Sequence, residues 1–274
     1  MTTGQVRASS EWLALREPAD AAARAPELIE EVRSHLPTDV GMAIHDLGCG
    51  TGSMARWLAP QLAGPQRWVL YDRDAELLTL AAAEPPDVAF DGAPVTIETR
   101  MRDITRLDRG ELAGASLITA SALLDMMTAD EIERLVNTCA GQGCPVLIAL
   151  SVTGDVELTP ADPFDRSVAD AFNAHQRRTL TGRKLLGPDA IEAAVDGFAR
   201  AGHEVLVRES PWRLERGQAA LVAEWFTGWV AAACEQRPDL GPETDSYARR
   251  RLAEIADGRL SLTVHHQDLL ARPT

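Results

Sequence analysis

The chain of 274 residues has no long apolar run and no recognisable export signal. No apolar stretch reaches the roughly 18 residues that a membrane-spanning helix needs. Residues 1–12 also lack the basic and then apolar layout of a secretion signal. We therefore expect a cytoplasmic protein with no membrane partner.

Cysteine is scarce, and its spacing excludes two kinds of cross-linked fold. The four cysteines lie at positions 49, 139, 144 and 234, and none of them form a Cys-x-x-Cys pair. A disulfide framework or a structural zinc site usually shows such paired spacing. We expect free, mostly buried thiols.

Basic residues are too few to balance the acidic ones. The 27 lysines and arginines stand against 41 aspartates and glutamates, which gives a formal net charge of −14. Binding a phosphate backbone usually requires a concentrated basic surface, so a nucleic-acid partner is disfavoured. The sequence has two local basic clusters, in residues 177–184 and 249–251. Carboxylates surround the second cluster at Glu243, Asp245 and Glu254, so we expect a salt-bridged helix face there.

The most informative segment is a glycine-rich turn between a predicted strand and a predicted helix. Residues 44–52 read Ile-His-Asp-Leu-Gly-Cys-Gly-Thr-Gly, after the apolar start at Met42 and before a helix over 53–62. The alternating glycines let a ligand approach the backbone, and Asp46 can meet a cationic group. A nicotinamide fingerprint would need a glycine where Ser53 stands. The pattern therefore favours S-adenosylmethionine over a nicotinamide cofactor.

A carboxylate follows the next predicted strand at the distance expected for a ribose ligand. The strand over 67–71 ends at Asp72, which lies 20 residues after Gly52. Asp72 can accept hydrogen bonds from both ribose hydroxyls, whereas Asp74 is typical of an N-cap for a helix over 75–83.

A third predicted strand, over 95–99, leads to another acidic residue. Asp103 can accept a hydrogen bond from an adenine amino group, and Ile104 can pack on the ring. A single one of these acids would be read as a solvated loop carboxylate. Three acids in register indicate one nucleoside pocket.

These motifs together resemble those of the class I S-adenosylmethionine-dependent methyltransferases. The resemblance rests on Asp46 to Gly52, Asp72, Asp103-Ile104, and Ser121-Ala-Leu-Leu-Asp125 after a fourth strand, and it covers roughly residues 40–155. It implies an α/β fold with a doubly wound, seven-stranded, mostly parallel sheet, and S-adenosylhomocysteine as the product. The cofactor-binding residues that we expect are Arg16, Asp46, Gly48, Cys49, Gly50, Asp72, Arg73, Asp103, Ile104 and Ser121.

Strands and helices alternate along the remaining chain, which predicts one methyltransferase domain over 1–274. Its expected parts are a helical lid (1–39), the cofactor-binding half (40–154), a cap insertion (155–186) and the second half of the sheet with a helical insertion (187–274). Further predicted strands cover 116–120, 145–151, 203–209 and 259–265, with helices over 129–140 and 188–201. The helix over 217–236 has an apolar face that we expect in the core, with a subunit interface of a homodimer or an acceptor-lining wall as alternatives.

The lid is expected to consist of two amphipathic helices split around Pro18. Trp12 could cover the cofactor or contact the acceptor. Arg16 could meet the methionine carboxylate or an acidic acceptor, or it could pair with Glu17 or Asp20 on the same helix.

Two side chains are candidates for the general base. Asp125 follows strand four in the loop that faces the transferable methyl group in the family that the chain resembles; it could also orient the acceptor or cap the next helix. His175 lies on a predicted helix at the mouth, and a neutral imidazole can take a proton from a hydroxyl, although it could equally be a surface histidine. Asn173, Trp212 and His266 are the other expected acceptor contacts, together with Trp12.

A resident metal is not indicated. His265 and His266 are adjacent on a predicted strand, so they point to opposite faces and cannot easily bind one ion. Mg²⁺ held by Asp125 or Asp165 is possible, but no spacing demands it.

The expected activity is methyl transfer to a hydroxyl of a small metabolite, such as a sugar-like or polyketide-like acceptor. The Asn/Asp-Pro-Pro-Tyr motif of nucleobase and glutamine amino-methyltransferases is absent from Ser121 to Asp125. Transfer to nitrogen, carbon or a carboxylate stays open, as does a noncatalytic protein that binds S-adenosylmethionine.

Overall fold

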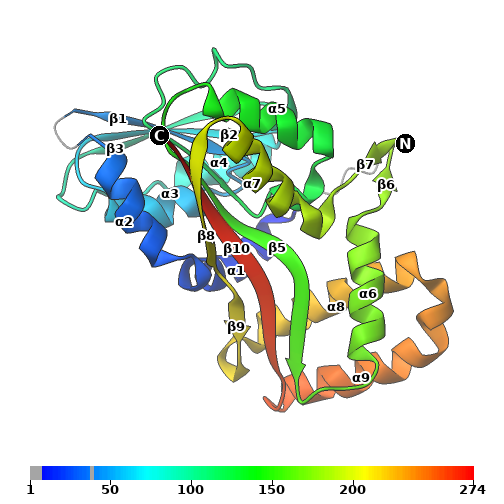
Figure 1. The fold of residues 1–274 in the computed structure, drawn as a ribbon. Coiled ribbons are helices and arrows are strands. Elements are labelled where there is room, and N and C mark those ends of the chain that lie inside the picture. The colour runs from blue at the N-terminus through cyan, green and yellow to red at the C-terminus, as the bar shows by residue number, and fades with distance from the viewer. Residues whose placement is uncertain (1–7, 38–39) are drawn as a thin grey trace.

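The computed structural model describes residues 8–37 and 40–274, and an eight-stranded sheet lies at its centre (Figure 1). The strand order is β3-β2-β1-β4-β5-β10-β8, and the short β9 pairs with β10. The first five strands of this order are parallel, and β10 is antiparallel to both of its neighbours. The predicted doubly wound, mostly parallel α/β sheet is thus confirmed. The strands are β1 (Met42–Leu47), β2 (Gln66–Asp72), β3 (Val95–Met101), β4 (Leu117–Ser121), β5 (Val146–Thr159), β8 (His203–Glu209), β9 (Trp212–Leu214) and β10 (Ser261–Pro273), while β6 (Thr179–Leu180) and β7 (Arg183–Lys184) form a separate hairpin.

Helices cover both faces of the sheet. On one face, Val69 and Ile118 pack with Phe198 of α7, and on the other Trp68 packs with Leu28 of α2. Alternate strand residues point to opposite faces, so the unbroken apolar run of β2 serves both layers. The helices are α1 (Ser10–Ala23), α2 (Pro26–His35), α3 (Ser53–Leu58), α4 (Ala75–Ala83), α5 (Ala129–Ala140), α6 (Asp165–Gln176), α7 (Ala190–Arg200), α8 (Ala219–Gln236) and α9 (Gly241–Ala256).

Several predicted bounds were too short or too long. The helices over 75–83 and 129–140 and the strand over 203–209 are confirmed, whereas β5 and β10 run well past the predicted ends at 151 and 265. These two strands pair with each other beyond the body of the sheet, and one of their faces meets solvent there, so the apolar signal fades before the strands end. The helix predicted over 53–62 stops at Leu58 and continues as a 3₁₀ turn over Ala59–Gln61, because Pro60 lacks a backbone N–H.

The prediction that Pro18 splits the first helix was wrong. Helix α1 runs through Pro18, and the break comes later, between Ala23 and Pro26. A proline within a helix removes one hydrogen bond, and here α1 is held by packing of Ala19 against the core beside α8 and β9. A proline disfavours helical geometry at the residue before it, which explains why the chain turns just before Pro26.

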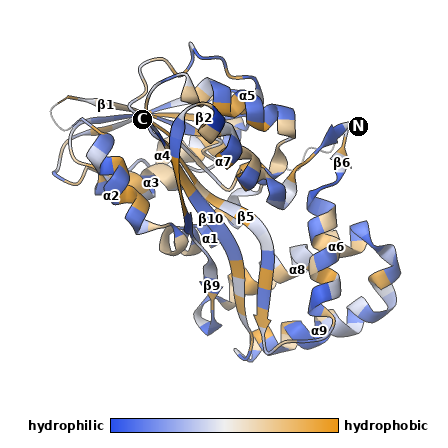
Figure 2. Ribbon diagram, in the orientation of Figure 1, coloured by the Kyte–Doolittle hydropathy of each residue, from blue (hydrophilic) through white to orange (hydrophobic). Residues whose placement is uncertain are grey.

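A second core lies beside the sheet, where α6, α8 and α9 pack around the far ends of β5 and β10 (Figure 1). In Figure 2, α6 and α9 carry both hydrophobic and hydrophilic residues, as expected of helices that bury one face. The apolar face of α8 lies in this core, which confirms the core alternative for residues 217–236. Its buried residues are Leu221, Val222, Phe226, Trp229, Val230 and Ala233.

The basic cluster of residues 249–251 is only partly a surface feature. Arg250 forms an ion pair with Asp162, while Arg251 is almost fully buried and contacts Asp165 at 2.8 Å and Glu254 at 2.8 Å. Tyr247 also donates a hydrogen bond to Asp165, at 2.6 Å. The expected salt-bridged face is therefore real, but Arg251 ties α9 to α6 inside the second core.

One buried carboxylate, Asp268 in β10, joins three segments of the fold. Its oxygens accept hydrogen bonds from the backbone N–H of Ala25 at 2.9 Å, the backbone N–H of Leu150 at 2.7 Å, and the hydroxyl of Ser210 at 2.5 Å. These donors belong to the α1–α2 corner, to β5 and to the connection between β8 and β9. Asp268 thus fixes three segments that are far apart in the sequence.

We predict that Asp268→Ala lowers the free energy of unfolding by about 2–5 kcal/mol, because two backbone N–H groups would be buried without acceptors. Urea unfolding followed by circular dichroism measures this. Asp170→Ala, at an exposed carboxylate of α6, is the matched control and should stay within about 0.5 kcal/mol of the parent. Equal stabilities for the two variants would contradict the role given to Asp268.

Candidate cofactor and active site

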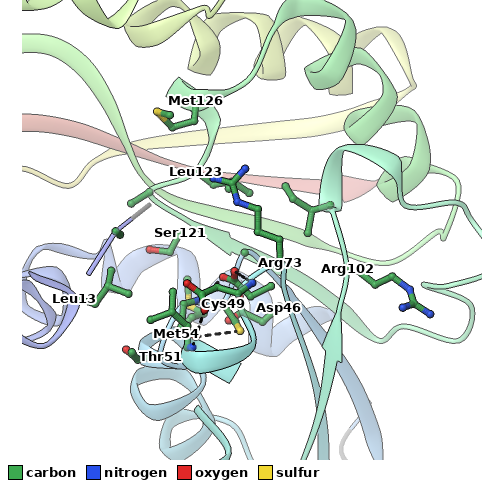
Figure 3. A pocket seen from close by; sticks show the side chains of 18 of the residues that line it. Leu13, Asp46, Cys49, Thr51, Met54, Arg73, Arg102, Ser121, Leu123 and Met126 are labelled. Carbon is green, nitrogen blue, oxygen red and sulfur yellow. Dashed lines mark hydrogen bonds between the residues drawn. The ribbon is translucent and has the colours of Figure 1, made fainter. Parts of the chain in front are cut away.

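A cavity of about 780 Å³ opens at the carboxyl ends of β1, β2 and β4 (Figure 3). Ligands of open α/β sheets bind in this place. The residues predicted to bind the cofactor, from Arg16 to Ser121, all line the cavity. The structure therefore brings them together, and what each one binds stays a prediction.

The glycine turn forms one wall of the cavity. Gly48, Gly50 and Gly52 have φ angles of 69°, 55° and 87°, which L side chains rarely adopt. A Cβ atom on Gly48 would lie 2.9 Å from a methyl group of Leu123, and one on Gly50 would lie 3.1 Å from a methyl group of Leu13. The turn thus needs glycine for its backbone shape and for the close approach of both leucines.

Asp72 holds the turn in place and also faces the cavity. One carboxylate oxygen accepts from the backbone N–H of Gly50 at 2.9 Å, and the other accepts from the N–H of Asp74 at 3.0 Å. Each carboxylate oxygen can accept a second hydrogen bond, so a ribose hydroxyl can still be bound. Asp74 accepts from the N–H groups of Glu76 and Leu77, which confirms it as the N-cap of α4.

Asp46 is a buried carboxylate, and only one of its two oxygens accepts a hydrogen bond from a described residue. The Thr119 hydroxyl donates to one oxygen at 2.7 Å, and the other oxygen has no hydrogen-bond partner among the described residues. Burial raises the pKa of Asp46 to about 7, although the hydrogen bond from Thr119 and the charge of Arg24 oppose this. A cation beside the free oxygen would restore the charged form, as the ammonium group of a methionine moiety can.

Arg24 is a component of the site that the sequence did not reveal. Its guanidinium is buried, lies 5.0 Å from the ring centroid of Trp57, and places Nη2 3.3 Å from both the Ser53 and the Ser121 hydroxyls. Nε and Nη1 have no partner within the described ranges. Burial lowers the pKa of Arg24, and the charge of Asp20 is the largest opposing influence. In the sequence Arg24 looks like one polar residue of a surface helix, and only the turn before Pro26 brings it inward.

Arg16 forms an ion pair with Asp20, which is one of the alternatives predicted for it. Nε lies 2.9 Å from a carboxylate oxygen of Asp20, and the guanidinium carbon lies 4.9 Å from the Trp212 ring centroid. Trp212 donates from Nε1 to Asp20 at 3.0 Å, and its ring centroid is 6.4 Å from that of Trp12. Arg16 lines the cavity, whereas Trp12 and Trp212 are not among the described residues that line it.

Asp103 and Ile104 both line the cavity. Asp103 caps the 3₁₀ turn η2 (Ile104–Arg106) by accepting from the backbone N–H and the hydroxyl of Thr105, at 3.1 and 2.7 Å. Its second oxygen pairs loosely with Arg106, at 3.6 Å. The adenine role predicted for this pair is compatible with these contacts and stays a prediction.

Asp125 lies in the 3₁₀ turn η3 (Leu124–Met126), directly after β4. Its neighbours Leu123 and Met126 line the cavity, while its own side chain is half-buried and stands beside the lining. Burial raises the pKa of Asp125 to about 6, and its own backbone N–H and the charges of Arg16 and Arg178 act in the opposite direction. The helix cap that was one alternative for Asp125 is supplied by Thr128 in a capping box.

Two other predicted active-site residues, His175 and Asn173, lie on α6. His175 has Nδ1 3.2 Å from Nη1 of Arg178 and Nε2 3.4 Å from Glu235, and burial lowers its pKa. Asn173 donates to the backbone oxygen of Gly154 at 2.8 Å. None of these side chains lines the cavity in the part of the chain that the structure describes.

His266 is buried in β10, 5.4 Å from the Trp212 ring, and burial lowers its pKa to about 3, so it is neutral at physiological pH. The half-buried His265 faces Glu157 instead, at 3.2 Å, as expected for adjacent strand residues. No group of three or more potential metal ligands occurs among residues 8–37 and 40–274. Within the same ranges all four cysteines are free, and no helix is long and apolar enough to cross a membrane.

Comparisons with known proteins agree with this site. Residues 44–142, from within β1 to just past the end of α5, match a family model described as a methyltransferase domain. These residues carry a methyltransferase domain. The chain is therefore a transferase enzyme.

Two solved structures share the fold of this methyltransferase over nearly its whole length. The cyclopropane synthase MmaA2 from Mycobacterium tuberculosis is 13% identical, with a TM-score of 0.51 and coverage of 96% of this chain and 94% of that one. The mycolic acid cyclopropane synthase CmaA1, solved with SAH and CTAB, is 12% identical, with a TM-score of 0.51 and the same coverage. At this identity the likeness concerns the fold alone. A search of curated proteins finds no match to the chain.

The raised pKa of Asp46 predicts that cofactor binding by the methyltransferase depends on pH. At pH values below its pKa of about 7, the carboxylate must lose a proton before it can meet the ammonium group. The affinity for S-adenosylhomocysteine should therefore fall by about tenfold for each pH unit below 7. Titration calorimetry between pH 5.5 and 8 measures this.

Asp46→Asn removes the ionisable group, so its weaker affinity should lose this pH dependence. In the ligand-free parent, the folded state holds this proton to a higher pH than the unfolded state does. This group therefore makes the parent less stable as the pH rises from about 4 to 7. Asp170→Asn is the control and should keep the parent's profile. A pH dependence that persists in Asp46→Asn would contradict the assignment.

Proposed function

We propose that this methyltransferase transfers a methyl group from S-adenosylmethionine to a hydroxyl oxygen of a small metabolite, with Asp125 as the general base. The observation that supports this proposal is the partly buried Asp125 carboxylate directly after β4, beside the cavity wall that Leu123 and Met126 form. S-Adenosylmethionine supplies an activated methyl group on a positively charged sulfur. The residues of the chain must bind both reactants, orient them and remove one proton.

The residues present fit this cofactor. The three left-handed glycines form a cradle with no room for side chains, and Asp46 has a buried oxygen without a partner among the described residues. Each carboxylate oxygen of Asp72 accepts one backbone hydrogen bond beside the turn and can accept a second one from the cofactor. Arg16, which lines the cavity, and Arg24, which contacts the lining residue Ser53, are two cations that can meet a methionine carboxylate.

The chemistry of a hydroxyl acceptor matches the properties of Asp125. A hydroxyl proton becomes acidic only as the oxygen bonds to the methyl group, so a nearby base lowers the barrier. A carboxylate with a pKa of about 6 is ionised at neutral pH and is more basic than an ordinary aspartate. Arg16 and Arg178 are close enough to influence its charge, and they can hold a polar acceptor in the same region.

The direct experiment is a screen for methyl transfer from S-adenosylmethionine to hydroxylated metabolites, with the product's methylated atom identified by nuclear magnetic resonance. An O-methyl product supports the proposal. A product methylated on nitrogen or carbon would keep the methyltransferase and refute the oxygen acceptor.

We predict that Asp125→Asn lowers kcat by about 10²- to 10⁴-fold at saturating cofactor, since it removes the base and nearly preserves shape. Its affinity for S-adenosylhomocysteine should equal that of the parent. The parent's kcat should rise as the pH passes through about 6, because Asp125 loses its proton there, and the variant should lack this rise.

Two further variants complete this test. Asp130→Asn, at an exposed carboxylate in the first turn of α5, is the matched control and should retain full activity. His175→Ala tests the second predicted base. Full activity of Asp125→Asn together with a large loss in His175→Ala would transfer the base role to His175.

A further inference from the structure

A second groove, of about 640 Å³, adjoins the cofactor cavity and is rich in arginine. Its arginines come from five places in the sequence, so no basic run announces it: Arg73, Arg106, Arg109, Arg134 and Arg183. The protein as a whole carries a net charge of −14. This concentration of positive charge is therefore a local feature that the overall composition does not explain.

The arginines lie close together because they belong to α5 and to the elements beside it. Arg134 lies on the exposed side of α5, and Arg109 lies across the end of that helix, where a Cβ atom on Gly141 would be 2.7 Å from Nε of Arg109. Arg106 belongs to η2, and Arg183 belongs to β7. The groove is thus built from regular elements and the turn beside them.

The groove holds more positive than negative charge. Two carboxylates line it: Glu131, which pairs with Arg183 at 2.6 Å, and Asp103, which contacts Arg106 at 3.6 Å. Arg109 and Arg134 are exposed and form no ion pair with any described residue. Like charges so close together repel one another, so the groove favours an anion that can contact several guanidinium groups.

The chemistry of the lining selects the kind of anion. All the basic side chains of the groove are arginines, whose planar donors bind phosphate or carboxylate oxygens in pairs. Three phosphate oxygens can accept from several arginines at once, whereas one carboxylate satisfies fewer donors. A phosphoryl group therefore matches this lining best.

The groove is connected to the active site. Arg73, Asp103, Thr105 and Arg183 line both the groove and the cofactor cavity. Arg183 also donates from Nη2 to the backbone oxygen of Met126 at 3.1 Å, next to Asp125 in η3. A ligand anchored in the groove can therefore extend toward the proposed base.

We propose that the methyl acceptor carries a phosphoryl group, which this arginine groove binds. The proposal has two parts: the groove binds a phosphoryl group, and that group belongs to the methyl acceptor. Only the second part rests on the proposed function, because the groove can bind a phosphoryl group whatever reaction the protein catalyses. Two experiments separate these parts.

The first experiment measures binding of inorganic pyrophosphate to the protein loaded with S-adenosylhomocysteine, by titration calorimetry. We expect binding by the parent and a loss of at least tenfold in affinity in the double variant Arg109→Ala/Arg134→Ala. Both residues are exposed and lack ion-pair partners among the described residues, so thermal unfolding should be unchanged. Arg166→Ala, at an arginine of α6 that is 91% exposed, is the matched control.

Absence of pyrophosphate binding in the parent, or equal affinity in the double variant, would overturn the groove as a phosphoryl site. A loss in Arg166→Ala as large as that in the double variant would show a nonspecific charge effect and would overturn it as well. Binding of S-adenosylhomocysteine is measured on the same samples, so a failure of the cofactor site is seen separately.

The second experiment distinguishes an acceptor phosphate from free phosphate. Methyl transfer from labelled S-adenosylmethionine is measured with a pool of small metabolites before and after phosphatase treatment. We expect transfer that phosphatase abolishes and that the double variant loses. Transfer that survives phosphatase would assign the groove to free phosphate and overturn the phosphorylated acceptor. No transfer in either pool, with pyrophosphate binding intact, would contradict the proposed function and leave the anion site.

Discussion

The Asp268 carboxylate is the interaction on which the rest of the structure depends. It is buried in β10 and holds the backbone of Ala25, the backbone of Leu150 and the hydroxyl of Ser210. Leu150 has a φ of 56°, which costs a non-glycine residue free energy, so a strong acceptor at its N–H has a clear structural purpose. The contact to Ala25 fixes the corner at which α1 turns into α2, and that corner places Arg24 behind the cofactor cavity. One side chain of the last strand thus determines where the N-terminal helices meet the site.

The cofactor end of the cavity is arranged around charges that are buried and incompletely paired. Asp46 and Arg24 each have polar atoms without a hydrogen-bond partner in the described part of the chain. Burial raises the pKa of Asp46 and lowers the pKa of Arg24, so it favours the neutral form of each side chain. A zwitterionic ligand carries the two opposite charges that such a pair lacks. Elsewhere in the site, Arg16 and Asp20 are already paired with each other, and burial raises the pKa of Asp125 to about 6. Cofactor binding and the proposed removal of a proton therefore depend on different local environments.

Local patterns in the sequence predicted much of the cofactor end, whereas roles that depend on distant contacts were missed. The glycine turn, Asp72 and the Asp74 cap are local, because strand, turn and helix are consecutive, and they lie where they were expected. Arg24 and Asp268 were missed because their roles come from pairs separated by about 100 to 240 residues in the sequence. The ends of β5 and β10 were missed because their outer halves alternate between core and solvent. Arg251 was expected at the surface, since a triplet of arginines gives no sign that one of them faces a buried carboxylate.

The measurement that tests the central claim most directly is titration calorimetry of the purified protein with S-adenosylmethionine, S-adenosylhomocysteine and, as a control, NAD. The site described around Asp46, Asp72 and the glycine turn predicts saturable binding of the first two with one site per chain. It predicts no binding of NAD, since Ser53 replaces the glycine that a dinucleotide turn needs. Binding of NAD, or no binding of either sulfur compound, would contradict the cofactor assignment and leave only the fold.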